Sequence, residues 1–392
     1  MDIFEKCNQY TVAREAMATG YYPYFFPMTD NEGTEAVYDG KRLLMCGSNN
    51  YLGLTTHPRV RQAAIRAIER YGSSCTGSRF VNGTLELHVQ LERELAEFVG
   101  KETALVFTTG MQVNLGTISA LVGRGEYVVL DKDDHASIVD GARLSWGETK
   151  RFRHNDLADL ERVLAGLPEE RGRLVVVDGL YSMGGDLAPL PEMIPICRKY
   201  GARLMVDDAH ATGVFGGGRG SAAYFGVTDQ VDLIMSTFSK SFASVGGFIS
   251  GDEEVIHYIK HHARAMIFSA SLSPANAAAA LEALHIMRDE PEHAERALRN
   301  GEYMRREMRR IGLDIGNSVS PIIPIYIRDD MRTLLAWKLL MEAGVFTNPV
   351  ISPAVAEGAQ LLRTSYMATH TQDQLDRALE AYQQMGRQVG LI

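Results

Sequence analysis

Short apolar runs alternate with amphipathic stretches through the middle of the chain, and this alternation constrains the fold more than any other feature. Stretches of helical character separate several of these runs, which is typical of a mostly parallel sheet with helices on both faces. The sequence therefore predicts an α/β fold. The predicted strands are 104–108, 127–130, 174–177, 204–206, 233–236 and 247–250.

The flanking regions differ from this pattern. Two helices precede the sheet: one begins at Pro58, and Gly100 ends the other. After about Pro291 come a charged helix (292–310), a strand (322–327), a helix (334–341), a strand (361–365) and a last helix from Gln372. We expect an N-terminal arm over 1–50, a large domain over 51–290 and a smaller α+β C-terminal domain over 291–392.

Charge and cysteine content exclude several function classes. The net charge of −9 over 392 residues gives no reason to expect nucleic acid. The four cysteines are far apart and form no C-x-x-C pair, so neither a zinc site nor a disulfide framework is indicated. The first residues lack a basic segment followed by an apolar core, and no run of about 18 apolar residues occurs. We expect a cytoplasmic protein without a transmembrane segment.

Lys240 and Asp207 each come at the end of an apolar strand, and together they predict a cofactor. Burial disfavours the ammonium and favours the nucleophilic amine, so a lysine in this place suggests a covalent use. The carboxylate of Asp207 can keep a pyridine nitrogen protonated, which is the other half of a pyridoxal phosphate (PLP) site. A metal site at Asp207 and His210 competes with this interpretation, but no third ligand is suitably spaced and Lys240 would be unexplained. We predict no metal.

Other polar residues follow neighbouring strands. Gly110 and Met111 open a helix directly after a strand, and helix N-termini bind phosphate, although an ordinary strand-to-helix turn is an equal alternative. Thr237 and Ser239 flank the lysine and suit phosphate oxygens. His135 and Ser182 also follow strands; the histidine could lie flat against an aromatic cofactor, and the serine could donate to a ring oxygen.

Five motifs carry a resemblance to a known family over nearly the whole chain. They are Ser48 to Leu54, Gly77 to Thr84, Asp134-His135-Ala136-Ser137, Thr237-Phe238-Ser239-Lys240-Ser241 and Met367-Ala368-Thr369-His370. With them the chain resembles the α-oxoamine synthase family of fold-type I PLP enzymes. The resemblance implies a homodimer with shared active sites, in which the segment Phe268 to Ser271 reaches the neighbouring subunit's phosphate.

The resemblance also implies a role for each matching residue. Lys240 should hold PLP as an internal aldimine and then act as the base at Cα, Asp207 should pair with the pyridinium, and His135 should stack on the ring. His210 and Ser182 should bind the ring hydroxyl. Phosphate ligands should come from Gly110, Met111, Thr237, Ser239 and Ser271, and substrate contacts from Asn49 and Arg363, the latter as a carboxylate clamp.

The activity that the resemblance implies is a decarboxylating condensation of an amino acid with an acyl-CoA. Gly77 to Thr84, with His88, favours the branch that joins L-serine to a long-chain acyl-CoA such as palmitoyl-CoA, giving 3-ketodihydrosphingosine, CoA and CO2 in sphingolipid biosynthesis. Branches that use alanine or glycine with a shorter acyl-CoA, as in 8-amino-7-oxononanoate synthesis, stay open. So do a PLP-binding subunit without activity and a peripheral contact with the inner membrane.

Overall fold

The structure is a computed structural model that describes residues 2–392, and its chain divides into two compact units. Unit 1 consists of Met1–Ser48, Asn300–Tyr366 and His370–Ile392, and unit 2 of Asn49–Arg299 and Met367–Thr369. The predicted domain boundaries near residues 50 and 290 stay a prediction. In the described part of the chain, no helix is both long enough and apolar enough to cross a membrane.

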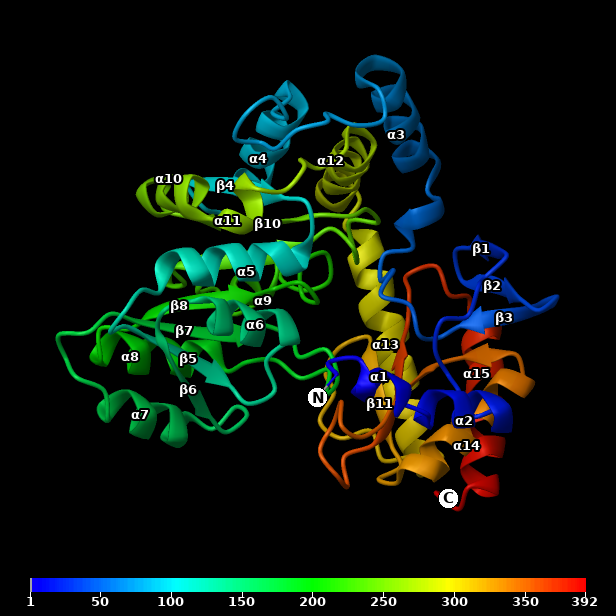
Figure 1. Cartoon of the computed structure of the whole chain (residues 1–392). Coiled ribbons are helices and arrows are strands. Elements are labelled where there is room, and N and C mark those ends of the chain that lie inside the picture. Colours follow the sequence, from blue (N-terminus) through cyan, green and yellow to red (C-terminus); the bar gives the residue numbers. More distant parts are fainter. Residues whose placement is uncertain (1) are drawn as a thin grey trace. The chain divides into compact units, whose positions relative to one another are not determined.

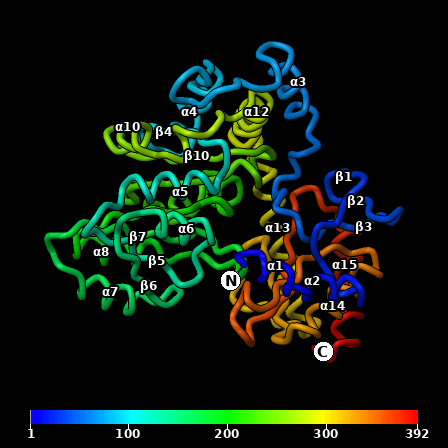
Figure 2. The backbone as a smooth tube through the Cα atoms, in the orientation of Figure 1, coloured from blue at the N-terminus to red at the C-terminus, as the bar shows by residue number. Residues whose placement is uncertain are grey.

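A seven-stranded sheet in the order β4-β10-β9-β8-β7-β5-β6 forms the centre of unit 2 (Figure 1). Strands β5 to β9 run parallel, and β10 pairs antiparallel with both β4 and β9, so the sheet is mostly parallel as predicted. Figure 2 shows that β4 and β10, far apart in sequence, run side by side. The strands are β4 (Thr103–Phe107), β5 (Tyr127–Asp131), β6 (Glu148–Phe152), β7 (Arg173–Asp178), β8 (Arg203–Asp207), β9 (Leu233–Thr237) and β10 (Gly247–Gly251).

All six predicted strands of this sheet are confirmed, and the sequence missed only β6. That strand reads Glu-Thr-Lys-Arg-Phe and lies at the edge of the sheet, where only Phe152 is buried. A polar edge strand has no apolar run by which sequence analysis could find it.

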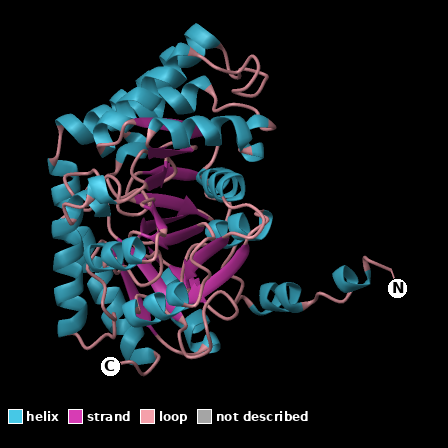
Figure 3. Ribbon diagram, turned by 90° about the vertical axis from the view of Figure 1, so that its left-hand side faces the viewer, coloured by secondary structure: helices cyan, strands magenta, loops and turns pink. Residues whose placement is uncertain are grey.

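Helices cover both faces of the sheet, as Figure 3 shows. Val129 packs in one apolar cluster with residues of α7 and α8, whereas Val128 and Leu130 pack in another with α5, α6 and α10. Successive strand residues point to opposite faces, so both faces are buried and the strands read as continuous apolar runs. The helices of unit 2 are η1 (Leu54–Thr56), α3 (Pro58–Tyr71), α4 (Glu86–Val99), α5 (Gly110–Leu121), α6 (Ala136–Leu144), α7 (Leu157–Ala165), α8 (Leu190–Lys199), α9 (Ser221–Tyr224), η2 (Thr228–Gln230), α10 (Glu253–His262), α11 (Arg264–Ile267) and α12 (Pro274–Asp289).

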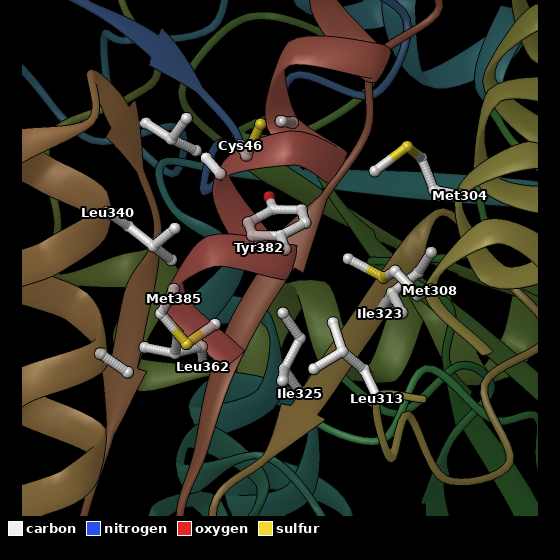
Figure 4. Packing of buried hydrophobic residues seen from close by; sticks show 14 of the residues in the cluster. Cys46, Met304, Met308, Leu313, Ile323, Ile325, Leu340, Leu362, Tyr382 and Met385 are labelled. Atoms are coloured by element: carbon white, nitrogen blue, oxygen red, sulfur yellow. The ribbon is translucent and has the colours of Figure 1, made fainter. Parts of the chain in front are cut away.

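Unit 1 has two small sheets, β1-β2-β3-β12 and β11-β14-β13, and its own core. Figure 4 shows side chains of several elements meeting around Tyr382, including Cys46, Ile325 and Met385. The predicted elements after residue 291 are confirmed; the sequence missed the short strands β1, β2, β3, β12 and β13. The elements are α1 (Glu5–Asn8), α2 (Val12–Thr19), β1 (Asp30–Glu32), β2 (Glu35–Tyr38), β3 (Lys41–Met45), α13 (Glu292–Arg310, which begins in unit 2), β11 (Ile322–Tyr326), α14 (Asp330–Glu342), β12 (Val345–Phe346), β13 (Asn348–Val350), β14 (Leu361–Ser365) and α15 (Gln372–Gln388).

Candidate active site

A cavity of about 390 Å³ lies where the carboxyl ends of the parallel strands of unit 2 meet. In open α/β sheets this edge is the usual place for a ligand. Most of the residues predicted for the site come together here. The lining consists of Asn49, Thr109, Gly110, Met111, His135, Ser137, Asp178, Asp207, Ala209, His210, Met235, Thr237, Ser239, Lys240, Val245 and Gly246.

The start of α5 forms one end of this cavity. Thr109 caps the helix by accepting a hydrogen bond from the backbone N–H of Gln112 at 3.2 Å. The N–H groups of Gly110 and Met111 have no partner inside the helix, because the first turn lacks preceding carbonyls. A Cβ on Gly110 would lie 2.5 Å from Oγ1 of Thr237, so only glycine lets the helix start approach that strand end. The result is a cradle of donors suited to a phosphate.

Asp207 and Asp208 are adjacent, yet only Asp207 lines the cavity. Its Oδ2 accepts from Nδ2 of Asn114 at 2.7 Å, and its Oδ1 accepts from the N–H of Ala209 at 3.1 Å. Asp208 is fully buried and accepts from Ser221 through the hydroxyl and the backbone N–H, and burial raises its pKa to about 7. Asp208 is therefore a packing residue, and Asp207 is the carboxylate available to a ligand.

A chain of hydrogen bonds connects His135 to Asp207. Nδ1 of His135 lies 2.7 Å from Oγ of Ser137, Nδ2 of Asn114 donates to that oxygen at 2.8 Å, and the same amide donates to Asp207. Burial lowers the pKa of His135, and the charge of Lys240 lowers it further against the opposing effect of Asp207. A neutral imidazole held in this way presents a fixed ring face at the cavity.

His210 is fixed from the side of Tyr51. The Tyr51 hydroxyl lies 2.7 Å from Nδ1 of His210 and 3.2 Å from Oδ1 of Asn49. Both rings are buried. His210 and Asn49, two predicted site residues, are thus joined by a tyrosine that the sequence analysis did not single out.

Lys240 lies three residues after β9, and its half-buried side chain lines the cavity. Asp178 ends β7 beside Asp207, with the two in register. Burial raises the pKa of Asp178 well above its usual range; the charge of Asp207 adds to this effect and that of Lys240 opposes it. The site therefore contains one carboxyl group that stays protonated more readily than an ordinary aspartate.

Three predicted residues are not among those that line the cavity. Ser182 lies in the turn after β7 and is half-buried. The N–H of Ser271 donates to the carbonyl of Gly77 at 2.9 Å, and its hydroxyl is buried without a hydrogen-bond partner in the described structure. Arg363 is buried in β14 of unit 1, where it pairs in register with Pro324 of β11 and Asn348 of β13.

Sequence analysis missed the residues that support the site rather than form it. Asn114, Tyr51 and Ser137 position Asp207, His210 and His135, respectively. Asn114 lies one helical turn after Gly110 and is fully buried, and a polar residue on the buried face of a helix was the signal available. Tyr51 carried no such signal, because most of the sequence of the large domain separates it from His210.

The lining fits PLP in each part of that molecule. A lysine amine, a buried carboxylate held by two donors, two histidines and a helix start beside two hydroxyl residues meet in one cavity. PLP needs an amine to form its covalent link, an acid for its ring nitrogen and donors for its phosphate. Lys240 would take the first role, Asp207 the second, and Gly110, Met111, Thr237 and Ser239 the third.

Comparison with known proteins identifies the family. Residues 41–381 match the model of the family described as aminotransferase class I and II. The chain belongs to this family. Within the aminotransferase class I and II family it is 51% identical over 377 residues to a serine palmitoyltransferase from Sphingobacterium spiritivorum, covering 96% of this chain and 94% of that protein.

Two further matches bear on the fold and on the alternative activity. A solved structure of SPT (serine palmitoyltransferase) with a PLP internal aldimine has a TM-score of 0.97 and 38% identity and covers 100% of both chains. An 8-amino-7-oxononanoate synthase from Thermoanaerobacter pseudethanolicus is 38% identical over 380 residues, 96% of each chain. The predicted fold-type I PLP transferase fold and the likeness to α-oxoamine synthases are confirmed.

Proposed function

We propose that the chain condenses L-serine with a long-chain acyl-CoA, palmitoyl-CoA in the simplest case, to give 3-ketodihydrosphingosine, CoA and CO2. This is the activity of a serine palmitoyltransferase in sphingolipid biosynthesis. The observation that carries the proposal is one cavity that joins Lys240 to Asp207, His135 and His210, in a chain that is 51% identical to a serine palmitoyltransferase.

PLP is the cofactor, as the family match and the related structure with PLP confirm. When bound, it supplies an electron-withdrawing ring that stabilises negative charge at the Cα of the amino acid. Asp207 would keep the ring nitrogen protonated; Asn114 and the Ala209 N–H hold the carboxylate in place. The phosphate cradle at Gly110 and Thr237 anchors the other end of the molecule.

Lys240 supplies both the attachment point and the base in this proposal. With an amino acid bound, the Nζ amine would lie beside the Cα–H bond and would accept that proton. His135, fixed through Ser137, would hold the ring face as a neutral imidazole. Arg363 clamps the substrate carboxylate with two parallel hydrogen bonds and so orients the Cα–H bond for removal. Asn49 contacts the substrate.

The remaining predicted contacts belong to the same proposal. Ser182 and His210 bind the ring hydroxyl. Ser271 binds phosphate. Its hydroxyl is buried and has no hydrogen-bond partner in the described structure, which supports a phosphate that is bound at the site of a second chain. We therefore also propose a homodimer with shared active sites. The exposed apolar side chains of Phe80, Val81 and Phe268 support an interface near Ser271 and the Gly77 to Thr84 segment.

Substrate choice is tested by a panel of amino acids and thioesters. L-serine, L-alanine and glycine are each offered with palmitoyl-CoA, pimeloyl-CoA and acetyl-CoA, and the product masses and CoA release are measured. We expect turnover with L-serine and palmitoyl-CoA. A preference for L-alanine with pimeloyl-CoA would contradict the proposal and favour 8-amino-7-oxononanoate synthesis, and an inactive protein that binds PLP would favour a non-catalytic subunit.

We also propose that the protein is cytoplasmic and makes a peripheral contact with the inner membrane. Sedimentation with vesicles tests this contact separately from turnover.

The dimer is tested by light scattering together with complementation. A Lys240→Ala chain mixed with a Ser271→Ala chain forms some sites in which both residues are intact, so activity should reappear in the mixture.

A further inference from the structure

Three side chains with metal-binding chemistry meet in unit 2 on elements that line none of the catalytic cavity. His57 directly precedes α3, Glu290 directly follows α12, and His293 lies in the first turn of α13. One ring nitrogen of each histidine and one carboxylate oxygen of Glu290 lie within 4.8 Å of one another. A movement of about an ångström would bring these atoms to the spacing that one shared ion requires.

His57 has a nitrogen that nothing else in the described structure uses. Its Nδ1 is buried and has no hydrogen-bond partner. A neutral imidazole carries a lone pair that can coordinate a metal. A buried polar atom without a partner is rare in folded proteins, and an ion is one of the few partners that a lone pair in this place could take.

Glu290 is already oriented by a second residue. Its Oε1 lies 2.6 Å from Nη1 of Arg59, and Nε of the same arginine lies 2.6 Å from Oε1 of Glu282. The charge of Arg59 is therefore shared between two carboxylates and does not cancel that of Glu290. The other oxygen, Oε2, lies 3.5 Å from Nε2 of His293, on the side of the histidines. Such an outer contact holds a ligand carboxylate in place.

We propose that His57, Glu290 and His293 form a binding site for a divalent transition metal, with Zn²⁺ as the ion that two imidazoles and one carboxylate suit best. Water would occupy the fourth position. The ion would join the start of α3 to the junction of α12 and α13. Because these segments are far apart in sequence, the site would act as a structural link within unit 2 and would take no part in the condensation.

Arg296 provides a specific check on this arrangement. Its Nη2 lies 3.1 Å from Nδ1 of His293. Since arginine can only donate, Nδ1 accepts here and the ring proton is on Nε2, facing Glu290. Metal binding at Nε2 moves that proton to Nδ1, after which Arg296 has to turn away. The Arg296→Gln variant should therefore bind Zn²⁺ more tightly than the wild type, whereas a purely structural His293–Arg296 contact predicts only a loss of stability.

The test uses the untagged holoenzyme, stripped with a chelator and titrated with Zn²⁺ alone in competition with an indicator dye. We expect one zinc ion per chain, with the affinity of His57→Ala and His293→Ala at least about tenfold weaker. The matched control is His261→Ala with His262→Ala, an exposed pair on α10, which should change nothing. Zinc should also raise the melting temperature of the wild type and of this control, but not of His57→Ala.

Equal zinc affinity in the wild type, His57→Ala and His293→Ala would overturn the proposal. If either alanine variant fails to fold, Glu290→Gln replaces it, because its amide oxygen still accepts from Arg59 while the negative charge is lost. Unchanged zinc affinity in Glu290→Gln, or no zinc bound by the wild type at concentrations that saturate the dye, would equally refute the site.

Discussion

The Tyr51 hydroxyl lies 2.7 Å from Nδ1 of His210, and the same hydroxyl lies 3.2 Å from Oδ1 of Asn49. A tyrosine hydroxyl has a single proton, so one arrangement satisfies both contacts: Nδ1–H of His210 donates to Tyr51, and Tyr51 donates to Asn49. Nε2 of His210 then carries the lone pair of the ring. Tyr51 thus sets which ring nitrogen of His210 accepts a proton from a ligand.

Replacing Tyr51 with phenylalanine tests this relay. The loss of one buried hydrogen bond of about 1 kcal/mol should lower kcat/KM roughly fivefold and shift the pH dependence of the bound cofactor's absorbance. Tyr366→Phe is the matched control, since Tyr366 is equally buried but pairs with Tyr382 in unit 1. An absorbance titration of Tyr51→Phe identical to that of the wild type would argue against the relay.

Substitution of the two adjacent aspartates, Asp207 and Asp208, should distinguish a functional role from a packing role. Asp207→Asn removes the charge that we propose for the ring nitrogen, and we expect turnover to fall roughly 100-fold or more while the fold is kept. Asp208→Asn alters a buried carboxyl group that accepts from Ser221 and does not line the cavity, so turnover should stay close to that of the wild type. Steady-state kinetics of the two variants decide the matter; the opposite order of effects would reverse the assignment.

Gly110→Ala should weaken cofactor binding. The added Cβ would lie 2.5 Å from Oγ1 of Thr237, so either the helix start or the strand end must shift at the phosphate cradle. We expect the dissociation constant for PLP to rise at least tenfold, corresponding to about 1.4 kcal/mol. Gly123→Ala is the control, because its new Cβ would meet only the flexible carboxylate of Glu126. Equal PLP affinity in both variants would count against the cradle.

A half-buried histidine, His154, should make stability depend on pH. Burial by itself lowers the pKa of His154, but hydrogen bonds and charges of Asp131 and Asp186 outweigh this effect and raise it to about 10 from 6.5. The contribution of His154 is therefore fully present below pH 6.5 and is lost as the pH rises through 10. Urea unfolding should show the wild type's advantage over His154→Gln shrinking across this window, and a constant difference would contradict the assignment.

Residue type and placement made part of the site predictable. Lys240, Asp207 and His135 follow apolar strands, and polar groups at strand ends of an α/β sheet share one edge. The strands themselves were predictable because both faces of the sheet are buried, which leaves continuous apolar runs. Gly110 was predictable from its position between a strand and a helix.

The rest depends on contacts between distant segments. Asn114 reaches Asp207, and Tyr51 reaches His210, through geometry that only the folded chain creates. Strand β6 was missed because its polar residues suit an exposed edge, and the sheet of β1, β2, β3 and β12 because its strands are short. Asp178 directly follows a predicted strand, but its raised pKa arises from burial and from Asp207 on the neighbouring strand.

The most direct measurement follows the carboxyl carbon of serine. The protein is given palmitoyl-CoA and L-serine labelled with ¹³C at the carboxylate. The masses of its products are measured and compared with those of the products of Lys240→Ala. We predict unlabelled 3-ketodihydrosphingosine, labelled CO2 and one CoA per product from the wild type, and none of them from Lys240→Ala with its fold intact. A condensed product that keeps the label, or equal turnover by Lys240→Ala, would contradict the account.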